Sequence, residues 1–513
     1  MAGRLLSLLV TATDVDQSIS FGRRITDLAE AHPDAIALVF APIEGDDRPV
    51  TWRELDARSS QVARLLASRG AGLGTMVAVA LPNSVDHFYA SLGAWKAGAG
   101  VIPMRWDVPA WERDRLLETS GVVLVVGDDA AGGPVPVVTR AELAATVDLD
   151  ASPLPDVVAN PAQGIASSGS TGRPKIIINS LPAEAIPSQI VAMPSHFSEL
   201  PDDLPQLIPA PLYHTNGFRI AHMQLFTDQL IVVMEKFDAA RAVDLIERYR
   251  LACFSAVPTM LQRIARLPDI KERDLSSIVY VMQGGAATPD WVVEAWLDLI
   301  GEEQFFMSYG SSEGVGLALL RGDEWPTHRG STGRGYRADI RILDADGREL
   351  PPGEIGEIYM RHAEDVGRRF EYLGADTPLP TADGFTSIGD LGWLDDDGYL
   401  YVADRRTDMI VTGGANVFPA EVEAALSEHP AVGDVVVVGV ADPEWGRRVH
   451  AIVEPSDAAA PPSIDELDAF ARARITAYKV PKTYAFRDRL PRTDAGKLNR
   501  NALAQERAEG TPS

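Results

Sequence analysis

The stretch from Met76 to Met104, MVAVALPNSVDHFYASLGAWKAGAGVIPM, decides the fold class. It opens with an apolar run, residues 76–81, that is typical of a buried strand. Residues 84–96 are then predicted as a helix, and a second apolar run, residues 100–104, as another strand. Because strands that alternate with helices build crossover units, we predict an α/β fold with mostly parallel sheets layered with helices.

The same alternation extends to both sides of this stretch. Thr51 and Glu54 form a capping-box pattern that starts a helix, and Gly70 is its stop signal. Downstream, residues 111–119 are predicted as a helix and residues 122–126 as a strand. These elements enlarge the predicted α/β domain on either side of its first strand.

A glycine cluster at positions 70, 72 and 74 could indicate a dinucleotide-binding turn. In that turn the glycines follow a strand and open a helix, so that a pyrophosphate meets the helix N-terminus. Here they follow a helix and precede a strand. The sequence therefore does not predict a nicotinamide-binding fold.

From Tyr399 onward the elements become shorter, which predicts a small α+β domain. The joint is placed in the charged stretch 404–408. We therefore predict a large N-terminal domain over residues 1–405 and a small, mobile C-terminal lid domain over residues 406–513. The elements predicted in the lid domain are strands at 409–411, 434–440 and 449–453 and helices at 419–426 and 463–475.

The composition and net charge of the chain indicate which classes of binding partner to expect. Of 513 residues, 46% are hydrophobic and 23% charged, which is typical of a globular protein with a sizeable core. With 47 Lys and Arg against 73 Asp and Glu, the net charge is −26. Such a field repels nucleic acid and anionic membranes, so we expect neither as a partner. The sequence leaves a homodimer open.

Compartment signals point to the cytoplasm. Cys253 is the only cysteine, which excludes an internal disulfide and suits a reducing compartment. The apolar run at residues 5–10 is far shorter than the roughly 20 residues that span a bilayer. No cleavage site follows it, so we predict a soluble, unexported, cytoplasmic protein.

The segment 167–175, SSGSTGRPK, combines hydroxyls, glycines and a lysine. Glycines let the backbone turn N–H groups toward an anion, hydroxyls add donors and the lysine adds charge, which indicates a polyphosphate-binding loop. A Ser/Gly-rich surface loop is the alternative. It is not a Walker loop, because Ser170 stands where that motif needs lysine and Pro174 would interrupt the following helix.

Further motifs follow this loop in a fixed order. They are 211–217 (PLYHTNG), 283–286 (QGGA), 308–313 (SYGSSE), 386–390 (TSIGD), Arg405 with 413–416 (GGAN) and 419–423 (PAEVE), and 492–497 (RTDAGK). The series resembles the signature of the adenylate-forming superfamily, which includes acyl-CoA synthetases, nonribosomal adenylation domains and firefly luciferase. The resemblance covers nearly the whole chain, and the conjunction of motifs makes coincidence implausible.

The resemblance implies ATP, Mg²⁺ and coenzyme A as ligands and three catalytic residues. Lys497, carried by the lid domain, would bridge the α-phosphate and the acyl oxygen. His214 would lie beside the acyl pocket. Glu313, with the Ser312 hydroxyl, would hold Mg²⁺. Taken singly, these residues have plainer interpretations. His214 is then a core histidine, Glu313 is a loop carboxylate, as is Asp390 in the motif 386–390, and Lys497 is a solvated lysine.

The resemblance also implies a larger set of nucleotide- and cofactor-binding residues. They are Ser167, Ser168, Gly169, Ser170, Thr171, Gly172 and Lys175 in the phosphate loop; Gly284, Gly285 and Ala286 at adenine; Ser308, Tyr309, Gly310, Ser311 and Ser312 over adenine and the α-phosphate; Asp390 at the ribose; and Arg405, Gly413 and Gly414 at the hinge and glycine loop.

The implied activity is AMP-forming activation of a carboxylic acid, followed by thioester formation with coenzyme A. Four basic residues are expected near coenzyme A, with surface solubility as the alternative: Arg447, Arg448, Lys479 and Lys482. An enzyme that adenylates only and passes the acyl group to a carrier protein stays open, as does a non-catalytic nucleotide-binding relative.

The acid itself is only weakly indicated. Small residues at 285, 310 and 316 suggest room for a bulky hydrophobic acid, and the chain resembles actinobacterial ligases for steroid, bile or terpenoid acids. Thr407 departs from the family pattern, which has Asp or Lys two positions after the hinge arginine. We expect it to change domain kinetics rather than to abolish hinging.

Overall fold

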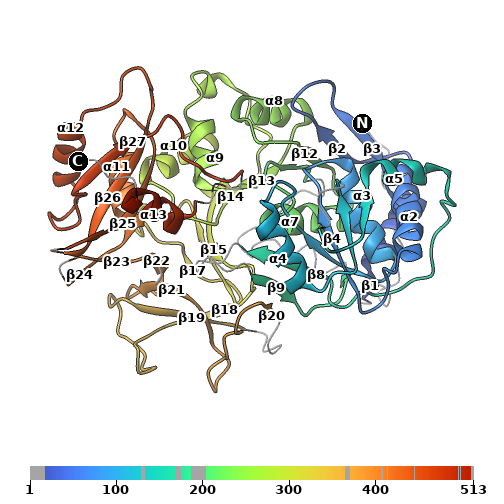
Figure 1. Cartoon of the computed structure of the whole chain (residues 1–513). Coiled ribbons are helices and arrows are strands. Elements are labelled where there is room, and N and C mark those ends of the chain that lie inside the picture. The colour runs from blue at the N-terminus through green and yellow to red at the C-terminus, as the bar shows by residue number, and fades with distance from the viewer. Residues whose placement is uncertain are drawn as a thin grey trace. The chain divides into compact units, whose positions relative to one another are not determined.

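The computed structural model describes residues 18–128, 133–167, 175–185, 204–363, 370–405, 408–412, 414–443, 445–494, 496 and 498–509. They form two compact units (Figure 1). Unit 1 contains the described residues up to Ser167, those from Lys175 to Lys236, and Phe370–Ala375. Unit 2 contains residues 237–363 and the described residues from Asp376 onward. The predicted domain boundary after residue 405 lies inside unit 2 and stays a prediction.

Unit 1 is built around a seven-stranded sheet with the order β20-β9-β8-β5-β4-β6-β7. Its central strand β4 (Met76–Ala80) pairs in parallel with β5 (Gly100–Pro103) and β6 (Leu124–Gly127). Helix α3 (Val85–Lys96) connects β4 to β5, as the sequence predicts. The remaining strands of this sheet are β7 (Val137–Thr139), β8 (Gln163–Ser167), β9 (Lys175–Asn179) and β20 (Phe370–Leu373).

A second group of strands in unit 1 is also mainly parallel. Strand β12 (Ile231–Met234) pairs in parallel with β11 (Gln206–Ile208) and β2 (Ile36–Ala41), and β3 (Arg48–Thr51) joins β2 antiparallel. The two-residue strands β1 (Ile19–Ser20) and β10 (Glu184–Ala185) pair antiparallel. The other helices of the unit are α1 (Phe21–Ala31), α2 (Trp52–Ser68), α4 (Ala110–Ser120), α5 (Arg140–Ala145) and α7 (Thr215–Phe226).

The start of α2 differs from its prediction. Thr51 Oγ1 accepts from the Glu54 backbone N–H at 3.2 Å, which is one half of the predicted capping box. The Glu54 carboxylate turns away and accepts a hydrogen bond from the Tyr89 hydroxyl at 2.7 Å. A tertiary contact with α3 therefore replaces the reciprocal half of the cap.

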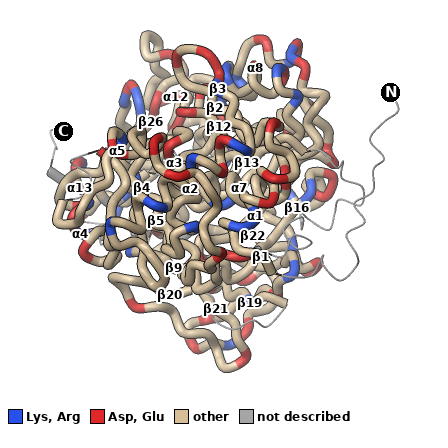
Figure 2. The backbone as a smooth tube through the Cα atoms, turned by 90° about the vertical axis from the view of Figure 1, so that its right-hand side faces the viewer, with Lys and Arg blue, Asp and Glu red and all other residues tan. Residues whose placement is uncertain are grey.

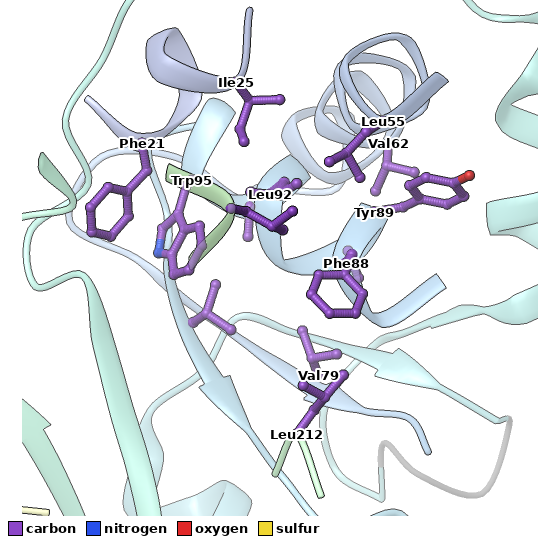
Figure 3. Close-up of a cluster of buried hydrophobic side chains, with 14 of the residues drawn as sticks. Phe21, Ile25, Leu55, Val62, Val79, Phe88, Tyr89, Leu92, Trp95 and Leu212 are labelled. Atoms are coloured by element: carbon purple, nitrogen blue, oxygen red, sulfur yellow. The ribbon is translucent and has the colours of Figure 1, made fainter. Parts of the chain in front are cut away.

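The core of unit 1 lies where α1, α2 and α3 meet the sheet. Figure 3 shows Phe21, Leu55 and Trp95 gathered with Phe88 and Val79 in one cluster, and each is less than 10% exposed. Burial of one such side chain contributes about 1.5–3 kcal/mol of hydrophobic free energy. The alternation read from the sequence thus builds a closed apolar layer over the central strands.

Unit 2 begins with a parallel core of β13 (Cys253–Ala256), β14 (Tyr280–Gln283) and β15 (Phe305–Gly310), followed by antiparallel β16 (Leu317–Arg321) and β17 (Arg334–Gly335). The helices of this region are α8 (Ala239–Tyr249), α9 (Pro258–Ala265) and α10 (Asp290–Ile300). A four-stranded antiparallel sheet, which the sequence did not predict, comprises β18 (Ala338–Leu343), β19 (Gly356–His362), β21 (Thr386–Leu394) and β22 (Leu400–Arg405).

The last part of unit 2 is the predicted small α+β region. Its long hairpin, β25 (Val432–Asp442) with β26 (Gly446–Pro455), extends beyond both predicted strands. Strands β23 (Ile410–Thr412), β24 (Ala415–Val417) and β27 (Thr483–Phe486) complete the sheet, with helices α11 (Pro419–Ser427), α12 (Ile464–Arg472) and α13 (Arg500–Glu509). The predicted α/β class with a small C-terminal α+β region is confirmed.

Charged residues are interspersed along the chain rather than gathered in one basic stripe in the view of Figure 2. Among the described helices, none has a stretch that is both long and apolar enough to span a bilayer.

Candidate functional site

The predicted adenine turn, Gly284–Ala286, comes directly after β14. Parallel strands β13, β14 and β15 end at one edge, the position where α/β sheets bind ligands. The Ser308 hydroxyl on β15 donates to the Gln283 carbonyl oxygen at 2.8 Å. A Cβ on Gly284 would come within 2.9 Å of that hydroxyl oxygen, and Gly285 has φ +88°. The turn therefore needs glycines to bring its backbone to the edge of the sheet.

Asp390, the predicted ribose ligand, is hydrogen-bonded to another residue of the predicted site. The Tyr309 hydroxyl donates to Asp390 Oδ2 at 2.7 Å, and Asp390 is only 7% exposed. In the β21–β22 ladder Asp390 is paired with Arg405, the predicted hinge arginine, whose side chain lies outside the described part. The preceding Gly389 has φ +89°, a conformation that turns the strand at this point.

The tract after β15 carries the residues predicted to bind the α-phosphate and its metal. The Ser311 hydroxyl oxygen is shielded from solvent and has no hydrogen-bond partner among the described residues. An orphaned buried hydroxyl is a donor in need of an acceptor. No cluster of three or more His, Cys, Asp or Glu able to hold a metal occurs in the described ranges. Mg²⁺ in phosphate-transfer sites commonly uses one or two carboxylates plus substrate phosphates, and Glu313 offers one such carboxylate beside the Ser312 hydroxyl.

The turn before Lys497 packs against α9. Gly496 has φ +74°, and a Cβ there would lie 2.8 Å from Thr259 Oγ1. Arg492 holds this turn by donating to the Gly496 carbonyl oxygen at 2.9 Å, and its guanidinium also pairs with Asp434. At the other end of α9, Arg266 donates to the Gly433 and Val432 carbonyl oxygens at 2.8 and 3.1 Å. No motif in the sequence pointed to Thr259 or Arg266.

The predicted acyl-pocket residue His214 lies in unit 1 at the N-cap of α7. The Tyr213 ring contacts both His214 and Trp106, at centroid distances of 4.4 and 5.7 Å. Asn83 holds the segment before the helix, because its amide donates to Ala210 O at 3.1 Å and its Oδ1 accepts from Leu212 N at 2.7 Å. His214 thus lies beside the Tyr213 ring, which in turn contacts Trp106, and such aromatic surroundings suit an apolar carboxylic acid.

The phosphate-loop lysine Lys175 is the first residue of β9, paired with Ser167 on β8. Its ammonium nitrogen lies 3.5 Å from the centroid of the Tyr372 ring on β20. This contact between distant segments was not predicted. It is a cation–π interaction, which favours a positive charge over the ring face.

Several predicted residues lie outside the described part of the chain. They are Ser168, Gly169, Ser170, Thr171, Gly172, Thr407, Gly413 and Lys497, together with the side chains of Ser167 and Arg405. The lone Cys253 is buried, and burial raises its thiol pKa to about 12. Such a raised pKa disfavours a thiolate nucleophile at this position.

The basic residues expected near coenzyme A are engaged in local contacts. Lys479 pairs with Glu421 at 2.6 Å, Arg448 lies 3.5 Å from Asp442, and Arg447 donates to a backbone carbonyl oxygen. Lys482 lies 5.5 Å from the centroid of the half-exposed Trp445 ring. Their role at coenzyme A stays a prediction.

The glycines expected to enlarge an acid pocket do not share one environment. A Cβ on Gly316 would come within 2.8 Å of the Met360 side chain, so this glycine makes room for a neighbour within its own unit. Gly310 similarly faces Leu317 at 3.2 Å. At Gly285 the nearest contact, Val257, is at an ordinary 3.6 Å. Gly310 and Gly316 therefore do not support the prediction of a bulky acid as substrate.

The predicted adenine turn and metal residues follow parallel strands of an α/β core, and the predicted ribose residue Asp390 lies within β21, an arrangement that is expected of an adenylate-forming protein. Comparison with family models gives the same class: the AMP-binding enzyme model matches residues 25–367, and the AMP-binding enzyme C-terminal domain model matches residues 421–497. The chain belongs to the AMP-binding enzyme family. The predicted membership of the adenylate-forming superfamily is confirmed.

Three curated relatives show the range of activities among similar chains. A fatty acid–[acyl-carrier-protein] ligase of Streptomyces coeruleorubidus is 30% identical, covering 89% of this chain and 92% of the relative. A 2-succinylbenzoate–CoA ligase of Bacillus licheniformis is 30% identical, covering 93% and 98%. A CoA ligase of Rhodococcus jostii, named for a methyl-dioxo-octahydro-indenyl-propanoyl group, is 30% identical, covering 91% and 95%.

Solved structures agree with these relatives. The o-succinylbenzoate CoA synthetase of Bacillus subtilis, bound to its acyl-adenylate intermediate, has a TM-score of 0.80 at 28% identity and covers 95% of this chain and 98% of that one. The same synthetase with ATP and a magnesium ion has a TM-score of 0.78 at 27% identity, covering 95% and 100%. ATP and Mg²⁺, predicted for this chain, are bound by that relative.

Proposed function

We propose that this protein is an acid:CoA ligase that activates a carboxylic acid with ATP and Mg²⁺ to an acyl-AMP and then forms the coenzyme A thioester. The observation that carries the proposal is the Tyr309–Asp390 hydrogen bond, 2.7 Å long, beside the glycine turn at the carboxyl edge of the parallel strands. A buried carboxylate and a glycine turn together can recognise a nucleoside.

In the first step, a carboxylate oxygen of the acid attacks the α-phosphorus of ATP. The new bond joins that oxygen to phosphorus, and the bond to the pyrophosphate oxygen breaks, so acyl-AMP and pyrophosphate are the products. Negative charge on the phosphoryl oxygens must be neutralised, which is the main catalytic task. Lys497 supplies charge at the α-phosphate, Lys175 at the departing pyrophosphate, and Glu313 with Ser312 holds Mg²⁺, which neutralises phosphate charge when bound.

In the second step, the coenzyme A thiol attacks the acyl carbonyl carbon, a carbon–sulfur bond forms and AMP leaves. The proposal gives Gly414 the approach to the pantetheine arm. This residue has φ +83°, and a Cβ there would meet nothing within 4 Å, so its backbone is open on that side. An open backbone allows close approach of an extended chain.

The experiment is a panel of aryl, long-chain and polycyclic carboxylic acids, each incubated with ATP and Mg²⁺, with and without coenzyme A. Formation of AMP and pyrophosphate that depends on one class of acid, with acyl-CoA as the final product, supports the proposal. The absence of ATP–pyrophosphate exchange with every acid would refute it and return the chain to a nucleotide-binding role.

A second candidate is ligation to a carrier protein, favoured by the 30% identity to the Streptomyces acyl-carrier-protein ligase. It shares the first step and replaces coenzyme A by a protein-bound pantetheine thiol. Pyrophosphate release without acyl-CoA formation, together with acylation of an added holo-carrier protein, would select this candidate. Efficient acyl-CoA formation would reject it.

We further propose a bulky hydrophobic acid as substrate, supported by the aromatic surroundings of His214 and by the ring system in the name of the Rhodococcus relative. A cytoplasmic location fits the lone, buried Cys253. A homodimer remains a proposal that light scattering of the purified protein would test.

A further inference from the structure

Lys175 and Tyr372 meet because of the register of two antiparallel strands. In the β9–β20 ladder Tyr372 is paired with Ile177. Alternate residues of a strand share one face, so Lys175 lies on the same face as Ile177 and therefore on that of Tyr372. The two residues are diagonal neighbours, close enough for a long side chain and a ring to touch. The observed ammonium–centroid distance of 3.5 Å follows from this placement.

The Tyr372 ring restricts a side chain that otherwise has many conformations. A lysine side chain loses up to about 2 kcal/mol of rotamer entropy when it is fixed. The ring face attracts the ammonium group, and the ring itself contacts Phe370 at a centroid distance of 5.4 Å. Both residues are partly buried, so water competes less with the contact than it would at an exposed site.

We propose that Tyr372 is a positioning residue for adenylation: its ring fixes the Lys175 ammonium at the start of β9 for the β- and γ-phosphates of ATP. The inference rests on the proposed function, which gives Lys175 that role. It assigns a task to a residue that belongs to none of the sequence motifs and comes from a distant segment of the chain. Loss of the ring would leave the lysine charge in place but remove the cation–π contact that restricts it.

The experiment compares five variants with the parent. Tyr372→Phe keeps the ring, Tyr372→Leu removes it, and Lys175→Met removes the charge, alone and combined with Tyr372→Leu. Glu371→Gln is the matched control, because Glu371 is exposed and adjacent to Tyr372 on the same strand. For each protein we would measure KM for ATP and for the acid in pyrophosphate exchange, the calorimetric Kd of MgATP without acid, and the melting temperature.

We expect Tyr372→Leu to raise KM and Kd for ATP about three- to tenfold, the range set by a partly desolvated cation–π contact. KM for the acid should stay unchanged, and Tyr372→Phe and Glu371→Gln should behave as the parent. In the Lys175→Met background, Tyr372→Leu should have no further effect on ATP, because the two residues act as a unit.

Three outcomes would overturn the inference. They are an unchanged ATP affinity in Tyr372→Leu, an equal and additive loss in the Lys175→Met background, and a loss in Tyr372→Phe as large as in Tyr372→Leu. If Tyr372→Leu has a lowered melting temperature, the cycle is repeated with Tyr372→Met, to which the same criteria apply. Failure of the proposed function is distinguishable, because then the parent itself shows no exchange.

Discussion

The residues of unit 2 that are predicted to bind the nucleotide and the residues of unit 1 that are predicted to bind phosphate and acid are held in place by different means. In unit 2, Ser308 and Tyr309 are fixed by short hydrogen bonds to Gln283 and Asp390. In unit 1, Lys175 rests on a ring, and His214 lies beside aromatic side chains. Hydrogen bonds are directional and suit the fixed pattern of a nucleoside, whereas ring faces tolerate a range of positions. Under the proposed function, we therefore expect nucleotide recognition to be rigid and acid recognition to be adaptable.

The largest expected effect comes from Lys497, the lysine of the predicted lid domain, which belongs to neither side of this comparison. Lys497→Ala should lower the adenylation rate about 10²-fold or more, because one donor to the transition state is lost. Thioester formation from synthetic acyl-AMP should change much less. Pre-steady-state rates of the two half-reactions check this. Lys271→Ala is the control, since Lys271 is an exposed lysine paired with Asp298. An adenylation rate equal to that of the parent would contradict the mechanism.

The next effect tests the rigidity of the nucleotide side. Asp390→Asn should reduce kcat/KM for ATP by about 10- to 100-fold, since a charge-assisted hydrogen bond contributes about 1.5–3 kcal/mol. Tyr309→Phe, which removes only the supporting hydroxyl, should cost about two- to tenfold. Steady-state kinetics with ATP varied measure both. If Tyr309→Phe costs as much as Asp390→Asn, the carboxylate is a structural group and the comparison with unit 1 fails.

The smallest expected effect concerns the stability of the buried core between helices α3 and α7 in unit 1. Helices α3 and α7 bury His87 and His222 among Phe88, Trp95 and Phe218, with ring centroids as close as 4.4 Å for the Phe218–His222 pair. The Nε2 atoms of both histidines lack a hydrogen-bond partner among the described residues. Burial lowers the pKa of His87 to about 3, with a further contribution from His222, and that of His222 to about 4.

A depressed native pKa gives a defined pH dependence of stability. Well above pH 6.5 both histidines are neutral in the folded and unfolded states, so they contribute nothing to the pH dependence of stability. As the pH falls below 6.5, these histidines bind protons in the unfolded chain but stay neutral in the folded chain, because their native pKa values are lower. Unfolding free energy should therefore fall by about 1 kcal/mol per histidine between pH 7 and pH 5.5.

The matched substitution is His222→Phe, which keeps an aromatic ring in the cluster. It should remove about 1 kcal/mol of that pH-dependent loss, measured by urea unfolding at the two pH values. His32→Gln, at an exposed histidine, is the control. If parent and His222→Phe lose the same amount of unfolding free energy on acidification, His222 is not held neutral. Low pH would then not selectively weaken the core of unit 1, which supports the residues predicted to bind the carboxylic acid.

Local pattern was enough for much of the fold. The apolar runs at Met76 and Gly100 and the helix between them follow from the period and length of the pattern, and the observed elements differ from the predictions by at most a few residues. The capping box at Thr51 forms only in part, because the Glu54 carboxylate accepts a hydrogen bond from the Tyr89 hydroxyl instead. The sheet of β18, β19, β21 and β22 was missed, since its antiparallel pairings join segments far apart and leave no local signal.

The sequence by itself determined the family, the α/β class and the identity of the motif residues, because glycine turns, hydroxyls and charges must recur at fixed spacing for phosphate chemistry. Only the tertiary structure decided which side chains hold those motifs in place. Tyr372 over Lys175, Thr259 against Gly496 and the buried pair His87 and His222 depend on strand register and helix packing, which bring distant residues together. Such contacts have no fixed spacing along the chain, so no pattern in the sequence announces them.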